Sequence, residues 1–156
     1  MIYVVIIGID PSLSCSGWAV VNASSSAYSV VASGAIRTSP ADSLQNRLLS
    51  IYSGIYGVIA AHQPQAAACE GQYLGPNVRT LMDLSCVRGV VLLACAQAGV
   101  ECAVYPPSCA KMDVAGSGRA TKKQVRAAVE QLTGWRARSY DRADAASIAL
   151  CRAMRQ

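Results

Sequence analysis

Four carboxylates spread along the chain place the strongest constraint on its fold. Asp10 and Glu70 each end a hydrophobic run, in the segments IIGID and AAACEG, and Asp141 and Asp144 stand three residues apart in YDRAD. A carboxylate at the end of a buried strand lies beside buried backbone, where an isolated charge is costly. If the fold brings the four together, bound cations must offset their mutual repulsion. Hard oxygen ligands of this kind suit magnesium or manganese.

The length and composition favour one intracellular domain. A chain of 156 residues with a hydrophobic content of 53% has ample material for one core. The opening MIYVVIIGID lacks a basic segment and a small-residue cleavage site, so it predicts a buried strand and not a signal peptide. The seven cysteines include no C-x-x-C pair, and the chain has a single histidine, His62. This pattern argues against a zinc site and favours reduced, buried thiols.

Basic residues are concentrated in the last third of the chain. Residues 1–105 carry four basic and five acidic side chains, whereas residues 106–156 carry ten basic and four acidic ones. Such a basic region suits a polyanion such as nucleic acid, and it also suits a solvated face that only aids solubility. The glycine-rich turn at 116–118 favours the first alternative, because its backbone can approach a phosphate. The basic set beside this turn is Lys111, Arg119, Lys122, Lys123 and Arg126.

Hydrophobic periodicity and turn residues predict a mixed sheet flanked by helices. An antiparallel meander of three strands comes first, and two further strands then alternate with helices. Strands are expected at 2–9, 17–21, 28–37, 66–70 and 101–105. Helices are expected from Pro40 to before Pro64, from 76–77 to about Gly99, from the glycine-rich turn to Gly134, and from Asp141 to about Met154. In the third helix, Val125, Ala128, Val129 and Leu132 are expected to face inward.

Each carboxylate also has an ordinary structural interpretation. Asp10 precedes Pro11, as in many turns, and Glu70 could end a strand in solvent. Asp141 and Asp144 could be an N-cap and a first-turn acid, since a helix N-terminus favours negative charge. These interpretations are compatible with catalysis, because a cap also orients the side chains that follow it.

The chain resembles the RuvC family of Holliday junction resolvases, which has a ribonuclease H-like fold. The resemblance lies in five segments that occur in the family's order: GIDPS with SGWAVV, CEG followed by Tyr73 and Asn77, RGVVLLA, GSGRATKKQV, and DRADAASIAL. It covers nearly the whole chain. Ser12 departs from a common glycine, and Thr121 stands where an acid often precedes the matching lysine. The resemblance implies a single nuclease domain over residues 1–156, in the cytoplasm of a bacterial cell or a phage-infected host.

The resemblance also implies a site and a reaction. Asp10, Glu70, Asp141 and Asp144 take the positions of the catalytic, metal-binding acids, and Lys122 joins the catalytic set. Two Mg²⁺ or Mn²⁺ ions about 4 Å apart would then cut a phosphodiester, leaving a 5′ phosphate and a 3′ hydroxyl. Tyr73 matches an aromatic position at the junction centre, although it could instead pack on its own domain. The DNA-binding residues expected are Tyr73, Asn77, Lys111, Arg119, Lys122, Lys123 and Arg126.

The expected function is structure-selective cleavage of four-way or related branched DNA by a homodimer. A four-way junction has two-fold symmetry, and the long helix from Asn77 has apolar residues on more than one face, with Leu84, Val87 and Val91 expected toward a partner. Partnership with branch-migration proteins stays open. The alternatives are a ribonuclease H-like nuclease on another substrate, such as an RNA–DNA hybrid, and a non-catalytic junction-binding protein. An actin-like sugar kinase needs two related subdomains, for which this chain is too short.

Overall fold

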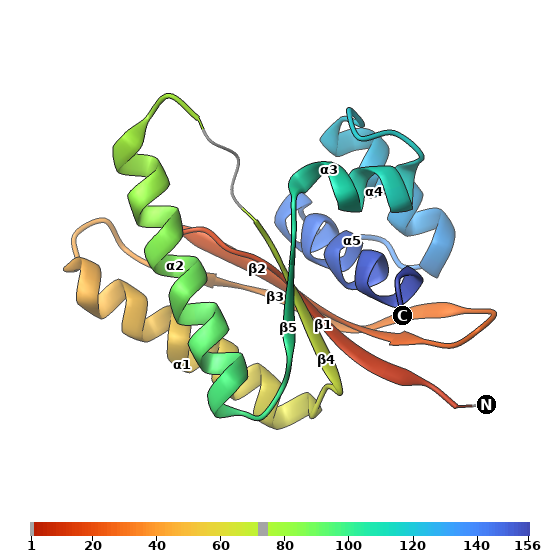
Figure 1. Ribbon diagram of the computed structural model, residues 1–156, viewed down its shortest axis with the longest axis horizontal. Coiled ribbons are helices and arrows are strands. Elements are labelled where there is room, and N and C mark those ends of the chain that lie inside the picture. Colours follow the sequence, from red (N-terminus) through yellow and green to blue (C-terminus); the bar gives the residue numbers. More distant parts are fainter. Residues whose placement is uncertain (1, 72–74) are drawn as a thin grey trace.

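The structure is a computed structural model that describes residues 2–71 and 75–156. A five-stranded sheet in the order β3-β2-β1-β4-β5 separates two groups of helices (Figure 1). The strands are β1 (Val4–Asp10), β2 (Cys15–Ala23), β3 (Tyr28–Arg37), β4 (Ala66–Glu70) and β5 (Cys102–Tyr105). β1, β2 and β3 pair antiparallel, whereas β4 pairs parallel with both β1 and β5. The expected mixed sheet, a meander followed by parallel strands, is therefore present.

In the described part of the chain, five helices cover the two faces of the sheet. The helices are α1 (Leu44–His62), α2 (Val78–Gln97), α3 (Pro107–Ala115), α4 (Lys122–Thr133) and α5 (Tyr140–Met154). In Figure 1, α1 and α2 lie on one side of the sheet and α3, α4 and α5 on the other. Across the described residues, none of these helices combines the length and hydropathy needed to span a bilayer.

Strand periodicity divides the core between the two faces. In β1, Ile6 packs with α4 and α5, while Ile7 and Ile9 pack with α1 and α2. The side facing α5 is built largely from small residues, since Gly8 lies against the backbone of Ala145 and Ala149. A Cβ at Gly8 would lie 2.0 Å from the Ala145 carbonyl oxygen. This close approach brings the helix that carries Asp141 and Asp144 onto the central strands.

The structure corrects the expected helix boundaries in three places. Helix α1 begins at Leu44, because the Ser43 side chain accepts the Asn46 amide and caps it. Helix α3 was not expected at all: Pro107 begins it, and proline is favoured in a first turn because its missing N–H would have no helical partner. The glycine-rich turn at 116–118 consequently ends α3, and the capping box of Thr121 begins α4.

Two expected side-chain orientations were wrong. Val87 and Val91 of α2 are completely buried in the core of this chain and cannot face a partner, and Leu84 is partly buried. Leu132 of α4 was expected inward but is 37% exposed. In α2 the apolar residues occupy more than one face, so their spacing did not fix which face meets the sheet. In α4 the apolar residues form one stripe, in which Val125 and Val129 are buried and Leu132, in the last turn, is exposed.

Candidate active site

Asp10 and Glu70 lie side by side at one edge of the sheet. Strands β1 and β4 are parallel with Ile9 opposite Cys69, so the next residues along each strand are neighbours. Successive strand residues point to opposite faces, and Ala68 packs with residues of α3 and α5. Asp10 and Glu70 therefore share the face that α3, α4 and α5 cover.

Helix α5 brings the other two acids to the same edge. Its N-cap is Ser139, whose hydroxyl accepts the Arg142 amide at 3.4 Å, and not Asp141. Asp141 lies in the first turn, and its backbone contacts Gly17, the β2 residue paired with Asp10. The expected convergence of all four acids on one end of the sheet is thus present in the backbone arrangement.

A pocket of about 250 Å³ opens between these elements. Three of the four acids line it, together with two lysines from α3 and α4. Asp141 lies beside the pocket and not in its lining. The lining residues are Asp10, Glu70, Pro107, Ala110, Lys111, Lys122, Val125, Asp144 and Ser147.

The three pocket carboxyls resist ionisation. Burial is the largest cause of the raised pKa of Asp10, and the charges of Glu70 and Asp144 raise it further. Burial also raises the pKa values of Glu70 and Asp144, which the charges of Lys111 and Lys122 partly oppose. Buried like charges of this kind are stabilised when a cation binds between them.

The two lysines of the pocket lining differ in exposure, since Lys111 is half-buried and Lys122 is exposed. Lys122 Nζ lies 3.7 Å from Asp144 Oδ2, and its side chain is 67% exposed while that of Asp144 is 21% exposed. A long ion pair with an exposed partner contributes little to stability. Lys122 can therefore leave Asp144 for an incoming anion at small cost.

The remaining expected DNA-binding residues do not share one environment. Arg119 and Lys123 are exposed, and Asn77 caps α2 by accepting the Thr80 amide at 3.1 Å. Arg126 is engaged within the chain, where it pairs with Glu130. The expected role of Tyr73 falls outside the described residues.

The chain is similar to known proteins over almost its whole length. The family model described as crossover junction endodeoxyribonuclease RuvC matches residues 6–152. The chain belongs to the RuvC family. A RuvC of Sphingopyxis alaskensis is 38% identical over 150 residues, covering 96% of each chain. A RuvC of Nitratidesulfovibrio vulgaris is 41% identical over 95% of this chain and 89% of its own.

Solved structures agree with the RuvC assignment. The structure of T. thermophilus RuvC in complex with Holliday junction substrate matches with a TM-score of 0.89 at 29% identity, covering 95% of this chain and 92% of its own. A yeast mitochondrial Holliday junction resolvase matches with a TM-score of 0.69 at 10% identity over 95% of this chain and 77% of its own, a likeness of fold alone. The expected ribonuclease H-like fold is confirmed.

Membership in the RuvC family implies dependence on a divalent metal, and the donor chemistry of the pocket fits one. Its three carboxyls supply the oxygen ligands that Mg²⁺ and Mn²⁺ prefer, and burial raises the pKa of each in the absence of a cation. Within the described residues, however, no group of three or more His, Cys, Asp or Glu side chains is arranged to hold a metal ion. Two of the acids have other partners here: Lys122 pairs with Asp144, and Asp141 accepts a hydrogen bond from the Cys15 thiol.

Cys15 is a neighbour of the site that sequence reasoning missed. Its thiol donates to Asp141 Oδ2 at 3.4 Å, and burial and this contact raise the pKa of the Cys15 thiol. The signal was present in the period-two pattern, because Cys15 and Gly17 lie on the same face of β2. The sequence alone did not reveal that α5 crosses this face.

Proposed function

We propose that this chain is a DNA endonuclease that resolves Holliday junctions or related branched DNA by metal-dependent phosphodiester hydrolysis. The observation that carries the proposal is the pocket in which Asp10, Glu70 and Asp144 meet Lys111 and Lys122. The match of residues 6–152 to the RuvC family supports the choice of substrate. A single nuclease domain over residues 1–156 and a cytoplasmic location, where such DNA is found, are parts of this proposal.

The proposed roles follow from charge and position. Asp10, Glu70, Asp141 and Asp144 would hold two Mg²⁺ or Mn²⁺ ions, and Asp141 would turn from Cys15 to do so. When bound, such ions supply Lewis acidity and charge neutralisation at the phosphate. Lys111 and Lys122 add positive charge to the pocket lining and draw a phosphate toward the acids. Burial of the acids excludes bulk water, which strengthens these interactions.

A cleavage panel tests the substrate. The protein is incubated with end-labelled four-way, three-way and linear duplex DNA and with an RNA–DNA hybrid, with and without Mg²⁺. We expect symmetric cuts in the four-way junction that require Mg²⁺ and leave a 5′ phosphate. Preferential cutting of the hybrid would redirect the proposal to another ribonuclease H-like nuclease, and binding without cutting would indicate a junction-binding protein.

The proposal includes a homodimer formed through α2. The exposed side of this helix carries Val78, Met82 and Leu93, which are 67%, 63% and 57% exposed, together with Cys86 and Gly89. Their spacing of four, four, three and four residues keeps them on one face of a helix. We expect a second copy of this chain to cover the exposed side of α2, because a four-way junction offers two equivalent cutting positions related by a two-fold axis.

Cys86 provides a direct test of this surface. All seven cysteines are among the described residues, and Cys86 is the only exposed one. It lies in the middle of the exposed side of α2. Sedimentation should give a dimer, and mild oxidation should give a covalent dimer that Cys86→Ser prevents. A monomer in sedimentation at high concentration with junction DNA bound would remove the dimer from the proposal and leave an enzyme that makes single nicks.

A further inference from the structure

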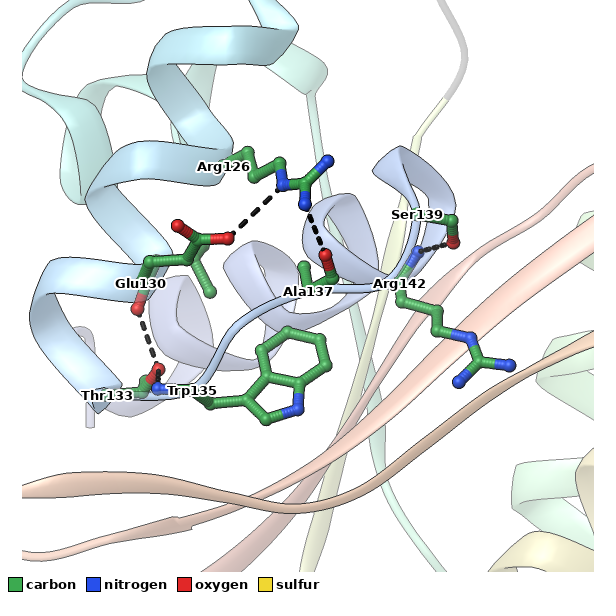
Figure 2. Close-up of polar contacts among 8 residues, drawn as sticks. Arg126, Glu130, Thr133, Trp135, Ala137, Ser139 and Arg142 are labelled. Carbon is green, nitrogen blue, oxygen red and sulfur yellow. Dashed lines mark hydrogen bonds and ion pairs between the residues drawn. The ribbon is translucent and has the colours of Figure 1, made fainter.

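The connection between α4 and α5 is held by one arginine. Arg126 Nη2 donates to the Ala137 carbonyl at 2.6 Å, and Arg126 Nε donates to Glu130 Oε1 at 3.2 Å. The guanidinium also lies over the Tyr140 ring, 5.6 Å from its centroid. Figure 2 shows Arg126 reaching from α4 to the connection, with Glu130 beside it. These three contacts fix the guanidinium between the helix and the chain that follows it.

The segment that Arg126 holds leads directly into the proposed site. Gly134 ends α4 in the left-handed conformation, and Ser139 caps α5. Ala137 lies halfway between them and is 2% exposed, so its carbonyl is fixed in a buried part of the connection. Asp141 follows four residues later, in the first turn of α5. A shift of the connection would therefore move the start of α5 and its acids.

We propose that Arg126 is a positioning residue of the nuclease site. It locks the 134–139 connection to α4 and thereby sets the start of α5, which presents Asp141 and Asp144. This inference rests on the proposed function and differs from the role expected from the sequence, which was a phosphate contact. Charge-assisted hydrogen bonds of this kind are among the stronger polar contacts in proteins, and a planar guanidinium makes two of them in a fixed geometry.

The two roles predict different kinetic effects for Arg126→Gln. A positioning residue should leave the junction affinity in Ca²⁺ and its salt dependence unchanged. The cleavage rate at saturating DNA should fall by about 10–100-fold, with a rise in the Mg²⁺ concentration that gives half of the maximal rate, as found for residues that orient metal ligands. A phosphate contact should instead weaken binding and reduce the salt slope by about one.

Two measurements without DNA test the positioning directly. Amide hydrogen exchange over residues 137–143 should be faster in Arg126→Gln than in the wild type. Binding of Mn²⁺ to the free protein, followed by electron paramagnetic resonance, should be weaker in the variant. Both measurements remain valid if the junction proves not to be the substrate, so failure of this inference can be told apart from failure of the proposed function.

Matched variants complete the test. Arg136 and Arg126 line the same pocket of about 350 Å³. Arg136→Gln therefore removes an equal charge from this pocket and should leave amide hydrogen exchange and Mn²⁺ binding unchanged. Arg126→Lys should keep more of the Mn²⁺ affinity than Arg126→Gln does, because an ammonium group can bond to either Glu130 or the Ala137 carbonyl. If Arg126→Gln does not fold, Glu130→Gln should show the same changes more weakly. It weakens one contact of the guanidinium and leaves the hydrogen bond to the Ala137 carbonyl in place. Unchanged exchange and Mn²⁺ binding in Arg126→Gln, or in Glu130→Gln in its place, would overturn the proposal.

Discussion

Replacing Gly17 by alanine should destabilise the fold and slow cleavage together. A Cβ at this position would lie 2.4 Å from the Asp141 carbonyl oxygen and 2.7 Å from its carbonyl carbon. Both atoms belong to the backbone of α5 and cannot rotate away. Contact between heavy atoms is favourable near about 3.5 Å. The first turn of α5 must therefore move away from β2 by about 1 Å.

The size of both effects follows from this displacement. Forcing an extra carbon into a packed interface costs about 1–3 kcal/mol of unfolding free energy. A misplacement of about 1 Å at a catalytic group reduces the rate by about 100-fold. Because Asp141 moves with the turn, the loss of activity should exceed the fraction of protein unfolded. Junction affinity in Ca²⁺ should change little.

Urea unfolding and junction cleavage at saturating DNA measure the two effects. Gly57→Ala is the matched control, because Gly57 is exposed on α1 and a Cβ there meets nothing within 4 Å. That variant should gain about 1 kcal/mol from helix propensity and keep full activity. If the unfolding free energy of Gly17→Ala lies within about 0.5 kcal/mol of the wild-type value, the clash is absent, because an extra carbon in a packed interface costs more than that.

Three further predictions concern other parts of the chain. Leu93→Glu should give a folded monomer in sedimentation, whereas Val87→Glu should fail to fold, as judged by circular dichroism, because Val87 is in the core. Asp10→Asn should abolish cleavage yet raise the urea midpoint of the metal-free protein, since it replaces a buried carboxyl whose pKa is raised. A hydrogen bond from Arg155 lowers the pKa of Asp113, so its stabilisation is present above about pH 4 and is lost as the pH falls through the lower folded value. Asp113→Asn should accordingly have a lower urea midpoint than the wild type at pH 7, and the two midpoints should converge in acid.

The strands and the strand-end acids were predictable because both depend on local pattern. Continuous β-branched runs predicted β1, and the period of two then places Asp10 and Glu70 on a common face once β1 and β4 are parallel neighbours. The resemblance to the RuvC family implied that the four acids converge, and the structure supplies the pairing of β1 with β4. Periodicity alone would have left Asp10 as a turn residue before Pro11.

The errors arose where tertiary contacts decide. Val87 was assigned to a partner surface because α2 is apolar on several sides, and only the packed structure shows which side meets the sheet. The DNA contact expected of Arg126 stays a prediction; its intrachain carbonyl partner, Ala137, gave no signal in the sequence. Helix α3 was missed because Pro107 indicates the end of a strand as readily as the first turn of a helix.

Asp10 differs from the other pocket acids in its electrostatic surroundings. Lys111 and Lys122 lower the pKa values of Glu70 and Asp144 and so offset part of the effect of burial. At Asp10, burial raises the pKa most, and Glu70, Asp144 and Asp141 raise it further. Lys111 and Lys122 thus oppose the effect of burial at Glu70 and Asp144, whereas burial and the neighbouring acids dominate at Asp10. A divalent cation bound beside Asp10 would relieve its repulsion with Glu70 and Asp144, and Asp10→Asn should therefore separate stability from catalysis.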